Sequence, residues 1–339
     1  MLAYRLVDWQ KPQLVDMPAP EASIGNVVIR IGGAGLCGTD VKLIAAPPGS
    51  TPFIPPYTLG HEIAGWVHEV GPGVSTLRPG DAVAVSAGAF CGRCALCASG
   101  HTNYCAAAQS GRGFGQDGGL AEFISVPERH AVPIGDLAPE DAAPLTDAAV
   151  TAYHAVRQVY PKLGPESTTV VIGTGGLGGY GVQFLRLLCP TTVVAIDTSP
   201  MRLEFASALG AHVTLPADDT NVASIRDLTG GQGADAVLDF VGTESAVHTA
   251  MASVRPLGSI RLVGGAGGSV PFGHSTLPAH GVDIVSPVGS TLRDLIDVLA
   301  LARAGRLRIE SERYSLADVE QAYDALRDGR LLSRAVVVP

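Results

Sequence analysis

Four cysteines that lie close together in the chain have the spacing of a metal site. They follow the pattern C-x₂-C-x₂-C-x₇-C, at Cys91, Cys94, Cys97 and Cys105. In a reducing compartment such clusters bind metals more often than they form disulfides, and four thiolates close a tetrahedral shell with no open position, as in structural zinc sites. An iron–sulfur cluster also uses four cysteines, and a zinc module for nucleic acid has similar local spacing. The intervening residues form no basic stripe, so we expect structural zinc.

A second motif has the pattern of a dinucleotide-binding turn. Residues 173–178 are Gly173-Thr174-Gly175-Gly176-Leu177-Gly178, which fits G-x-G-x-x-G. The motif follows a predicted buried strand, Thr169–Ile172, and opens a predicted apolar helix, Leu177–Leu188. Glycines there permit a tight turn, close approach of a pyrophosphate and packing of the helix on the sheet, while the helix N-terminus offers free N–H groups to phosphates.

An acidic residue after the next strand indicates which dinucleotide binds. Asp197 ends that strand, about 20 residues beyond the glycines, where a carboxylate accepts hydrogen bonds from the adenosine ribose. Its charge would repel a 2′-phosphate, which favours NAD over NADP. Arg202 either lies beside the adenosine or is a solvated helix residue. The alternative for the whole motif is an ordinary strand–turn–helix with a surface aspartate.

A second metal site is less clear from spacing. A catalytic zinc takes three protein ligands from Cys, His and carboxylate side chains and keeps one open position. Cys37 lies in a turn, His61 precedes Glu62, and Asp147 follows Thr146. An isolated cysteine in a turn is usually structural and an isolated His-Glu pair usually lies on the surface, so spacing alone leaves a metal role and a structural role about even.

Composition and charge exclude several classes of function. The 339 residues carry a net charge of −9, which argues against a nucleic-acid partner. No apolar run approaches the roughly 18 residues of a membrane span. The N-terminus has Arg5 and Asp8 and lacks an apolar signal core. These features predict a cytoplasmic protein.

The elements that must position these residues change character along the chain. The first 145 or so residues show short β-type segments, at 27–31, 63–70 and 82–85, with little helical periodicity. From about Thr151, strands at 169–172, 193–196, 236–238, 260–263 and 283–285 alternate with helices. This alternation predicts an α/β, doubly wound parallel sheet. An amphipathic helix from Leu292 to Leu299, a helix after Ser315 and a strand at 335–338 complete the chain.

The motifs, taken in order, resemble those of the zinc-containing medium-chain alcohol dehydrogenases over essentially the whole chain, and in particular those of the bacterial NAD-dependent secondary-alcohol dehydrogenase and carbonyl reductase subgroup. The matching segments are Cys37-Gly38-Thr39-Asp40, Gly60-His61-Glu62, the four cysteines, Asp117-Gly118-Gly119-Leu120-Ala121-Glu122, Thr146-Asp147-Ala148-Ala149 and the glycine fingerprint. The resemblance implies a β-rich, GroES-like catalytic domain at 1–149 and 289–339, with the structural zinc lobe at 91–105. It also implies a Rossmann NAD-binding domain at 150–288.

The resemblance also implies roles for individual residues. Cys37 and His61 would bind the catalytic zinc, with Asp147 in place of the second cysteine that many relatives use, and Glu62 would be a nearby or transient ligand. Asp40 would accept a hydrogen bond from the other nitrogen of His61 and fix its tautomer. Arg334 would lie near the cofactor phosphate and the metal site.

The proton path departs from the family pattern. Many relatives carry a histidine three positions after the hydroxyl residue, whereas Lys42 stands there in this chain. The relay therefore either ends at Thr39 and the cofactor ribose or continues through water or Lys42. Phe53, Tyr57 and Trp66 are candidate pocket residues, although core positions are commoner for such rings.

Together these features predict an enzyme with two zinc ions per chain that moves hydride between NAD(H) and a small, secondary alcohol or its carbonyl compound. A polyol or amino-alcohol substrate is the alternative within the family. A quinone or enoyl reductase would lack the metal ligands, and a non-enzymatic zinc protein would leave the fingerprint unexplained. The resemblance implies a homodimer or homotetramer built partly on edge pairing of Rossmann sheets.

Overall fold

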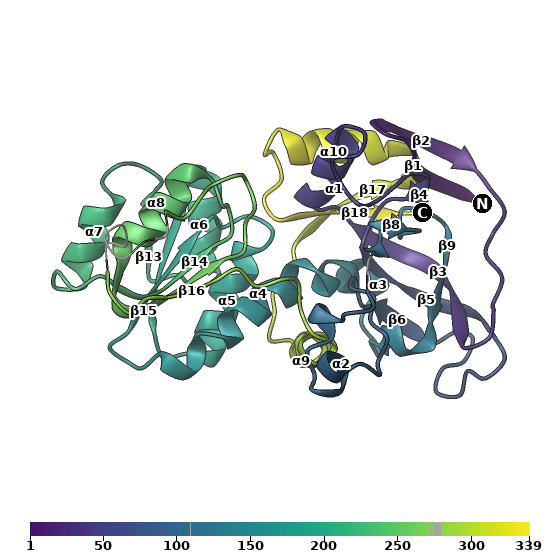
Figure 1. The fold of residues 1–339 in the computed structure, drawn as a ribbon, viewed down its shortest axis with the longest axis horizontal. Helices are drawn as coiled ribbons and strands as arrows, with labels where there is room; N and C mark the ends of the chain where they lie inside the picture. Colours follow the sequence, from purple (N-terminus) through teal and green to yellow (C-terminus); the bar gives the residue numbers. More distant parts are fainter. Residues whose placement is uncertain (109, 272, 274–278) are drawn as a thin grey trace. The chain divides into compact units, whose positions relative to one another are not determined.

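The computed structural model describes residues 1–108, 110–271, 273 and 279–339. The chain divides into two compact units, one formed by Met1–Val150 with Gly289–Pro339 and the other by Thr151–Val288 (Figure 1). The first boundary falls inside helix α4 (Ala148–Arg157), one residue beyond the position expected from the sequence.

The second unit is built on a parallel sheet of six strands. In spatial order they are β13 (Val213–Pro216), β12 (Thr192–Asp197), β11 (Thr168–Ile172), β14 (Ala234–Asp239), β15 (Val254–Leu262) and β16 (Asp283–Val285). Numbered by their order in the chain, this is 3-2-1-4-5-6, the Rossmann arrangement. The α/β, doubly wound fold predicted from the alternating pattern is therefore confirmed.

Helices connect these strands. They are α5 (Gly178–Leu188), α6 (Pro200–Ala208), α7 (Asn221–Leu228) and α8 (Glu244–Ser253), and Figure 1 shows them packed around the sheet. Val170, Val194 and Val237 lie on adjacent strands and are fully buried. Such Val-rich runs form strands because both faces of a parallel sheet are covered.

The first unit is mostly β-structure. Its strands are β1 (Leu2–Asp8), β2 (Lys11–Asp16), β3 (Asn26–Gly35), β4 (Tyr57–Thr58), β5 (Glu62–Val70), β6 (Ala82–Val85), β7 (Gly111–Arg112), β8 (Gly115–Gln116), β9 (Phe123–Pro127), β10 (Ala131–Pro133), β17 (Ser311–Ser315) and β18 (Arg334–Val338). The main sheet has the order β10-β6-β5-β3-β18-β17, and β9 also pairs with β3. The C-terminal strand β18 thereby lies beside β3, which brings Arg334 close to residues from the first third of the chain.

Short helices connect the strands of this unit. They are α1 (Gly38–Ala45), α2 (Ala95–Ala98), α3 (Pro139–Ala142), α9 (Leu292–Arg303) and α10 (Val319–Arg327), with 3₁₀ turns that include η3 (Ala143–Thr146). Among the described residues, no helix combines the length and the apolar character needed to cross a membrane. The expectation of little helix before residue 145 missed α1, which has only eight residues and so leaves little periodicity to detect.

Candidate active site, zinc sites and cofactor site

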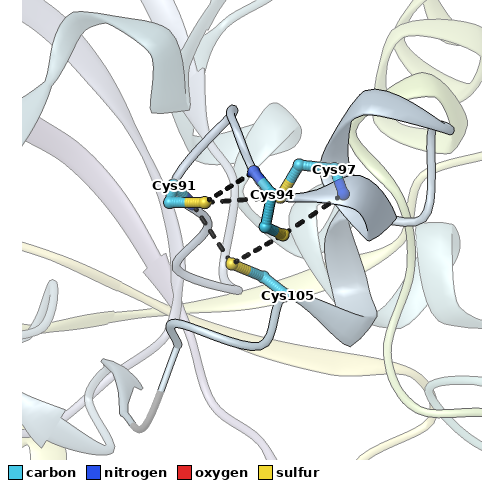
Figure 2. A group of neighbouring side chains, drawn as sticks. All are labelled: Cys91, Cys94, Cys97 and Cys105. Carbon is cyan, nitrogen blue, oxygen red and sulfur yellow. Dashed lines mark hydrogen bonds between the residues drawn. The ribbon is translucent and has the colours of Figure 1, made fainter.

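The four clustered cysteines converge on one point in the first unit (Figure 2). Their sulfur atoms lie within 4.8 Å of one another, and the Cys91–Cys97 and Cys94–Cys105 pairs are each 4.0 Å apart. A disulfide needs about 2.05 Å between sulfurs, so these cysteines are free thiols. A tetrahedral ion with metal–sulfur bonds of about 2.3 Å separates its ligands by ~3.8 Å. The geometry therefore fits a four-coordinate zinc.

Backbone N–H groups donate to three of these sulfurs and lower the pKa of the Cys94 and Cys105 thiols, whereas burial raises the pKa of the Cys97 thiol to about 12. The amide of Cys94 donates to Cys91 Sγ at 3.3 Å, and the amide of Cys91 donates to Cys105 Sγ at 3.3 Å. The amide of Cys97 donates to Cys94 Sγ and is the main reason that the pKa of the Cys94 thiol falls to about 6. Thiolates are the form that binds zinc.

The cysteine lobe is held to the rest of the first unit by aromatic and polar contacts. Phe90, which precedes Cys91, stacks on the buried His130 with ring centroids 4.5 Å apart. Its carbonyl lies 3.0 Å from His130 Nε2. On another side, the amide of Leu292 at the start of α9 donates to Thr102 Oγ1 at 2.9 Å. These contacts fix the lobe against elements far away in the sequence.

A second group of metal-ligating side chains comes from three distant segments of the first unit. Cys37 lies at the start of α1, His61 and Glu62 at the start of β5, and Asp147 between η3 and α4. Their ligand atoms all lie within 4.8 Å of one another, and His61 Nε2 is 3.4 Å from Asp147 Oδ2. Spacing alone did not decide between a metal-binding role and a structural role for these side chains. The structure brings the Cys, His and carboxylate groups together.

Asp40 positions two of these side chains. It is fully buried, and its Oδ2 accepts the backbone N–H of Cys37 at 3.0 Å, which caps α1. Its Oδ1 lies 3.1 Å from His61 Nδ1. A proton held on Nδ1 leaves Nε2, the nitrogen that faces Asp147, free to bind a metal.

Thr146 ties the Asp147 segment to β5. Its hydroxyl accepts the backbone N–H of Ile63 at 3.1 Å and donates to the Ala143 carbonyl at 2.8 Å. Asp147 therefore follows a turn that is hydrogen-bonded to the strand next to His61.

Glu62 and Arg334 form a buried ion pair at the same site. Arg334 is 4% exposed and its Nη2 contacts Glu62 Oε1 and, at 3.5 Å, Asp147 Oδ2. Gly35 lies opposite Glu62 on β3, and a Cβ there would be 2.1 Å from Glu62 Oε2. Only glycine leaves room for this carboxylate. Arg334 was expected near both the cofactor phosphate and the metal site. In the structure it contacts the Glu62 and Asp147 carboxylates of the metal-ligating group.

The charges of this group fit a divalent cation. Burial and Asp147 raise the pKa of the Glu62 carboxyl well above its usual value, although Arg334 opposes them. Burial lowers the pKa of His61, but Asp40 and Asp147 overcome that effect and raise it well above its usual value. The Glu62 shift comes mainly from burial, whereas the His61 shift comes from the nearby carboxylates. Moreover, Glu62 Oε2 is buried and has no hydrogen-bond partner among the described residues.

Two further candidate residues lie on α1. Thr39 is exposed, and its hydroxyl is 3.6 Å from Cys37 Sγ, so it lies beside the metal-ligating group and remains open to solvent. Lys42 is also exposed, one turn further along the helix. Thr39 thus brings a solvent-exposed hydroxyl next to the cysteine of this group.

The glycine fingerprint lines a cavity of about 1100 Å³ in the second unit. This exceeds the ~300–1000 Å³ typical of small-molecule pockets. Gly173, Gly175, Gly176, Leu177 and Gly178 all line it, at the N-terminus of α5. A Cβ on Gly178 would lie 1.8 Å from the Gly173 carbonyl oxygen, so glycine is required for the turn to close. The cavity has the N–H donors and the room that a dinucleotide needs.

Acidic side chains outnumber basic ones in the lining of the cavity. Asp197, Asp218, Asp219 and Glu244 line it, and Arg202 adds a positive charge. This balance disfavours a 2′-phosphate and agrees with the preference for NAD predicted from Asp197.

Asp197 has a partner that the sequence reasoning did not assign. The backbone N–H and the hydroxyl of Thr174 both donate to Asp197 Oδ2, at 2.7 and 3.1 Å. The amide of Ser199 donates to Oδ1 at 2.9 Å. Thr174 occupies a variable position of the fingerprint. A hydroxyl residue at that position was the one sequence feature that could have indicated a hydrogen bond to Asp197. It orients the carboxylate that would receive the ribose.

Two family profiles match the two parts of the chain. Residues 23–136 match the alcohol dehydrogenase GroES-like domain, and residues 176–304 match the zinc-binding dehydrogenase family. An NAD-dependent alcohol dehydrogenase of Sulfurisphaera tokodaii is 32% identical, and the alignment covers 100% of both chains. The chain belongs to the zinc-binding alcohol dehydrogenase family. The resemblance stated from the motifs is therefore confirmed.

Solved structures of family members have the same fold. The alcohol dehydrogenase of Aeropyrum pernix matches with a TM-score of 0.93 and 31% identity over 100% of both chains. An acetophenone reductase of Geotrichum candidum, solved with NAD, matches with a TM-score of 0.89 and 26% identity over 100% of this chain and 97% of that one. Relatives include NAD-dependent dehydrogenases and a zinc-bound alcohol dehydrogenase structure, and the residues described above fit both zinc and NAD.

The three aromatic candidates have different locations. Tyr57 is 1% exposed and belongs to the core. Trp66 packs under Arg30, whose guanidinium lies 4.5 Å from the ring centroid. Phe53 is half-buried and pairs with Phe114. The sequence did not identify Phe114 as a residue near the site. Its position between two glycines was the only local feature that distinguished it.

Proposed function

We propose that this chain is a zinc-dependent alcohol dehydrogenase and ketone reductase that transfers hydride between NAD(H) and a small secondary alcohol or its ketone. The observation that carries the proposal is the convergence of Cys37, His61, Glu62 and Asp147 on one point. Four such donors, with one buried carboxylate oxygen unpaired, fit a zinc with an exchangeable position.

In this proposal Cys37, His61 and Asp147 hold the catalytic zinc, and Glu62 is close enough to replace another ligand transiently. Bound there, zinc supplies Lewis-acid chemistry toward the oxygen of an alcohol or a carbonyl. Asp40 keeps the proton of His61 on Nδ1, and Arg334 contacts the carboxylates of Glu62 and Asp147 and holds them in place. Thr39 moves the proton of the alcohol from the site toward solvent, either directly or through Lys42.

We further propose that the first unit is the catalytic domain and that the second binds NAD. Gly173, Gly175, Gly176, Leu177 and Gly178 would hold the pyrophosphate at the start of α5. The carboxylate of Asp197, oriented by Thr174, would accept the ribose hydroxyls, and Arg202 would lie beside the adenosine. Cys91, Cys94, Cys97 and Cys105 would hold the second, structural zinc.

The assembly and location are parts of the same proposal. Family membership supports a homodimer or homotetramer. The acidic charge of the chain and its six free cysteines support a location in the cytoplasm. The strand β16 lies at an edge of the described sheet and is available for pairing. Light scattering should give a mass of two or four chains, and a monomer at working concentration would contradict this part.

The test of function is a panel of alcohols and ketones assayed by absorbance of the reduced nicotinamide, with NAD and NADP in parallel. We expect NAD-dependent turnover of secondary alcohols that is lost on removal of zinc. Turnover that persists in Cys37→Ser protein shown to contain only the structural zinc would contradict the proposal.

A further inference from the structure

A half-buried aromatic ring lies directly against the proposed zinc ligand His61. The ring of Phe114 is 4.5 Å from the His61 ring, centroid to centroid, with 35° between their planes. Phe53 extends this surface, because its ring centroid is 6.0 Å from that of Phe114. Both phenylalanines remain partly exposed to solvent. Ligand sites are lined predominantly by hydrophobic and aromatic side chains, and two adjoining rings beside a reactive site fit that pattern.

The backbone around Phe114 is built to hold the ring there. The flanking glycines, Gly113 and Gly115, have φ of +71° and +80°, a region that other residues rarely adopt. The amide of Phe114 donates to the Gly111 carbonyl at 3.0 Å, and the amide of Gly111 donates to the Phe114 carbonyl at 3.1 Å. This tight reciprocal pair fixes the loop, so the position of Phe114 is a property of the fold.

Close packing joins the same loop to the residue before His61. A Cβ on Gly113 would lie 2.9 Å from the carbonyl carbon of Gly60. The loop therefore packs directly against the segment that carries His61. Close by, the Gln116 side chain donates to the Ser110 hydroxyl at 2.9 Å, so these two polar groups are directed at each other.

Resting on the proposed function, we propose that Phe114 and Phe53 form an aromatic wall of the substrate site and select secondary alcohols and ketones that carry an aryl group on the reacting carbon. An aryl group gains offset or edge-to-face contacts with both rings. A polyol would lose the hydration of its hydroxyl groups against the same rings without a new hydrogen bond.

The test compares three substrates, 1-phenylethanol, 2-propanol and sorbitol, in the zinc-loaded enzyme with NAD. The variants are Phe114→Ala, Phe53→Ala and the matched control Phe123→Ala, a half-buried ring that pairs with His68 instead, with centroids 5.1 Å apart. We expect kcat/KM for 1-phenylethanol to fall about 10- to 100-fold in Phe114→Ala, as for other lost apolar contacts in a pocket. For 2-propanol the fall should be under about 3-fold, and the Phe123→Ala control should match the unmodified enzyme for all three substrates.

A binding measurement separates selection from general damage to the site. Calorimetry with acetophenone and zinc-loaded protein should show about 10-fold weaker binding in Phe114→Ala and no change in Phe123→Ala. If Phe114→Ala loses zinc because the ring packs on His61, the Phe53→Ala variant decides between the two explanations. It leaves the contact between Phe114 and His61 intact and should still weaken binding of acetophenone.

The outcomes distinguish this proposal from the proposed function. Equal losses for 1-phenylethanol and 2-propanol in both variants would show that the rings only shield the site, and would overturn the aromatic wall. A native preference for sorbitol over 1-phenylethanol would overturn it too, while the dehydrogenase activity would stand. Absence of NAD-dependent turnover with every member of the panel would overturn the proposed function itself.

Discussion

Replacement of Asp40 by asparagine tests how the proposed catalytic zinc site is positioned. Asp40 is fully buried and accepts two hydrogen bonds, one from the Cys37 amide at 3.0 Å and one across 3.1 Å from His61 Nδ1. Asparagine has the same shape but offers one acceptor oxygen and one NH₂ donor. Asp40→Asn can therefore satisfy only one of the two donors.

Either orientation of the amide harms the site. If the NH₂ group faces Cys37, the start of α1 loses its cap. If it faces His61, Nδ1 must accept, and the proton moves to Nε2, where it competes with the metal. Loss of such an outer-shell partner typically lowers metal affinity by about 10- to 100-fold, or ~1.4–2.7 kcal/mol.

A matched control is available in α9. Asp294 is also fully buried, and it caps its own helix in the same way, by accepting the Thr291 amide at 2.9 Å. Asp294→Asn should destabilise the fold to a similar extent without changing the metal affinity of the site formed by Cys37, His61 and Asp147. Zinc content should be titrated against a chelator in both variants. We expect one of the two zinc ions to leave Asp40→Asn at about 10- to 100-fold lower chelator concentration, and native retention of both ions in Asp40→Asn would refute the reasoning.

Three further predictions concern the proton path, cofactor choice and the cysteine lobe. Thr39→Val should lower kcat by about 10²–10⁴, the usual contribution of a positioned acid–base group, at unchanged zinc content; native turnover with an unshifted pH profile would mean that protons leave by another route. Asp197→Ser should narrow the preference for NAD over NADP by about 10-fold, or ~1.4 kcal/mol, in steady-state assays; a native enzyme that already prefers NADP would show that this carboxylate does not select the cofactor. Cys94→Ser should lose one zinc ion and have a lower melting temperature, while the folded fraction keeps its catalytic rate. The control Cys189→Ser should keep both zinc ions. A stable Cys94→Ser protein with a selectively lost chemical step would reverse the assignment of the lobe.

The parts of the site that could be predicted from the sequence are those whose residues lie close together in the chain. Four cysteines within one short segment can meet without any knowledge of the fold, and a strand, a glycine turn and a helix in succession can build a phosphate site by themselves. For these parts, residue types and spacing sufficed to predict which side chains come together.

The group of Cys37, His61 and Asp147 is not local. These residues come from three segments that meet only because β3, β5 and η3 pack together. Spacing alone left them about even, and the family resemblance grouped them. The same reason explains why Phe114 and the partnership of Thr174 with Asp197 were missed, since each depends on a contact between segments that the sequence does not show.

Arg334 shows what the C-terminal strand adds. The sequence placed it, by resemblance, near both the cofactor phosphate and the metal. Pairing of β18 with β3 buries it against Glu62 and Asp147, so its charge offsets the two carboxylates. Removal of any one of the three groups would leave an uncompensated buried charge, which typically costs about 3–5 kcal/mol.

The most direct test of the central claim is a zinc-reconstitution assay followed at the absorbance band of reduced nicotinamide. Protein stripped of the weaker-bound zinc should form no reduced cofactor from NAD and a secondary alcohol, and added zinc should restore the rate as one ion per chain returns. Full turnover in the stripped protein, or no turnover of any alcohol or ketone after zinc is restored, would contradict the account.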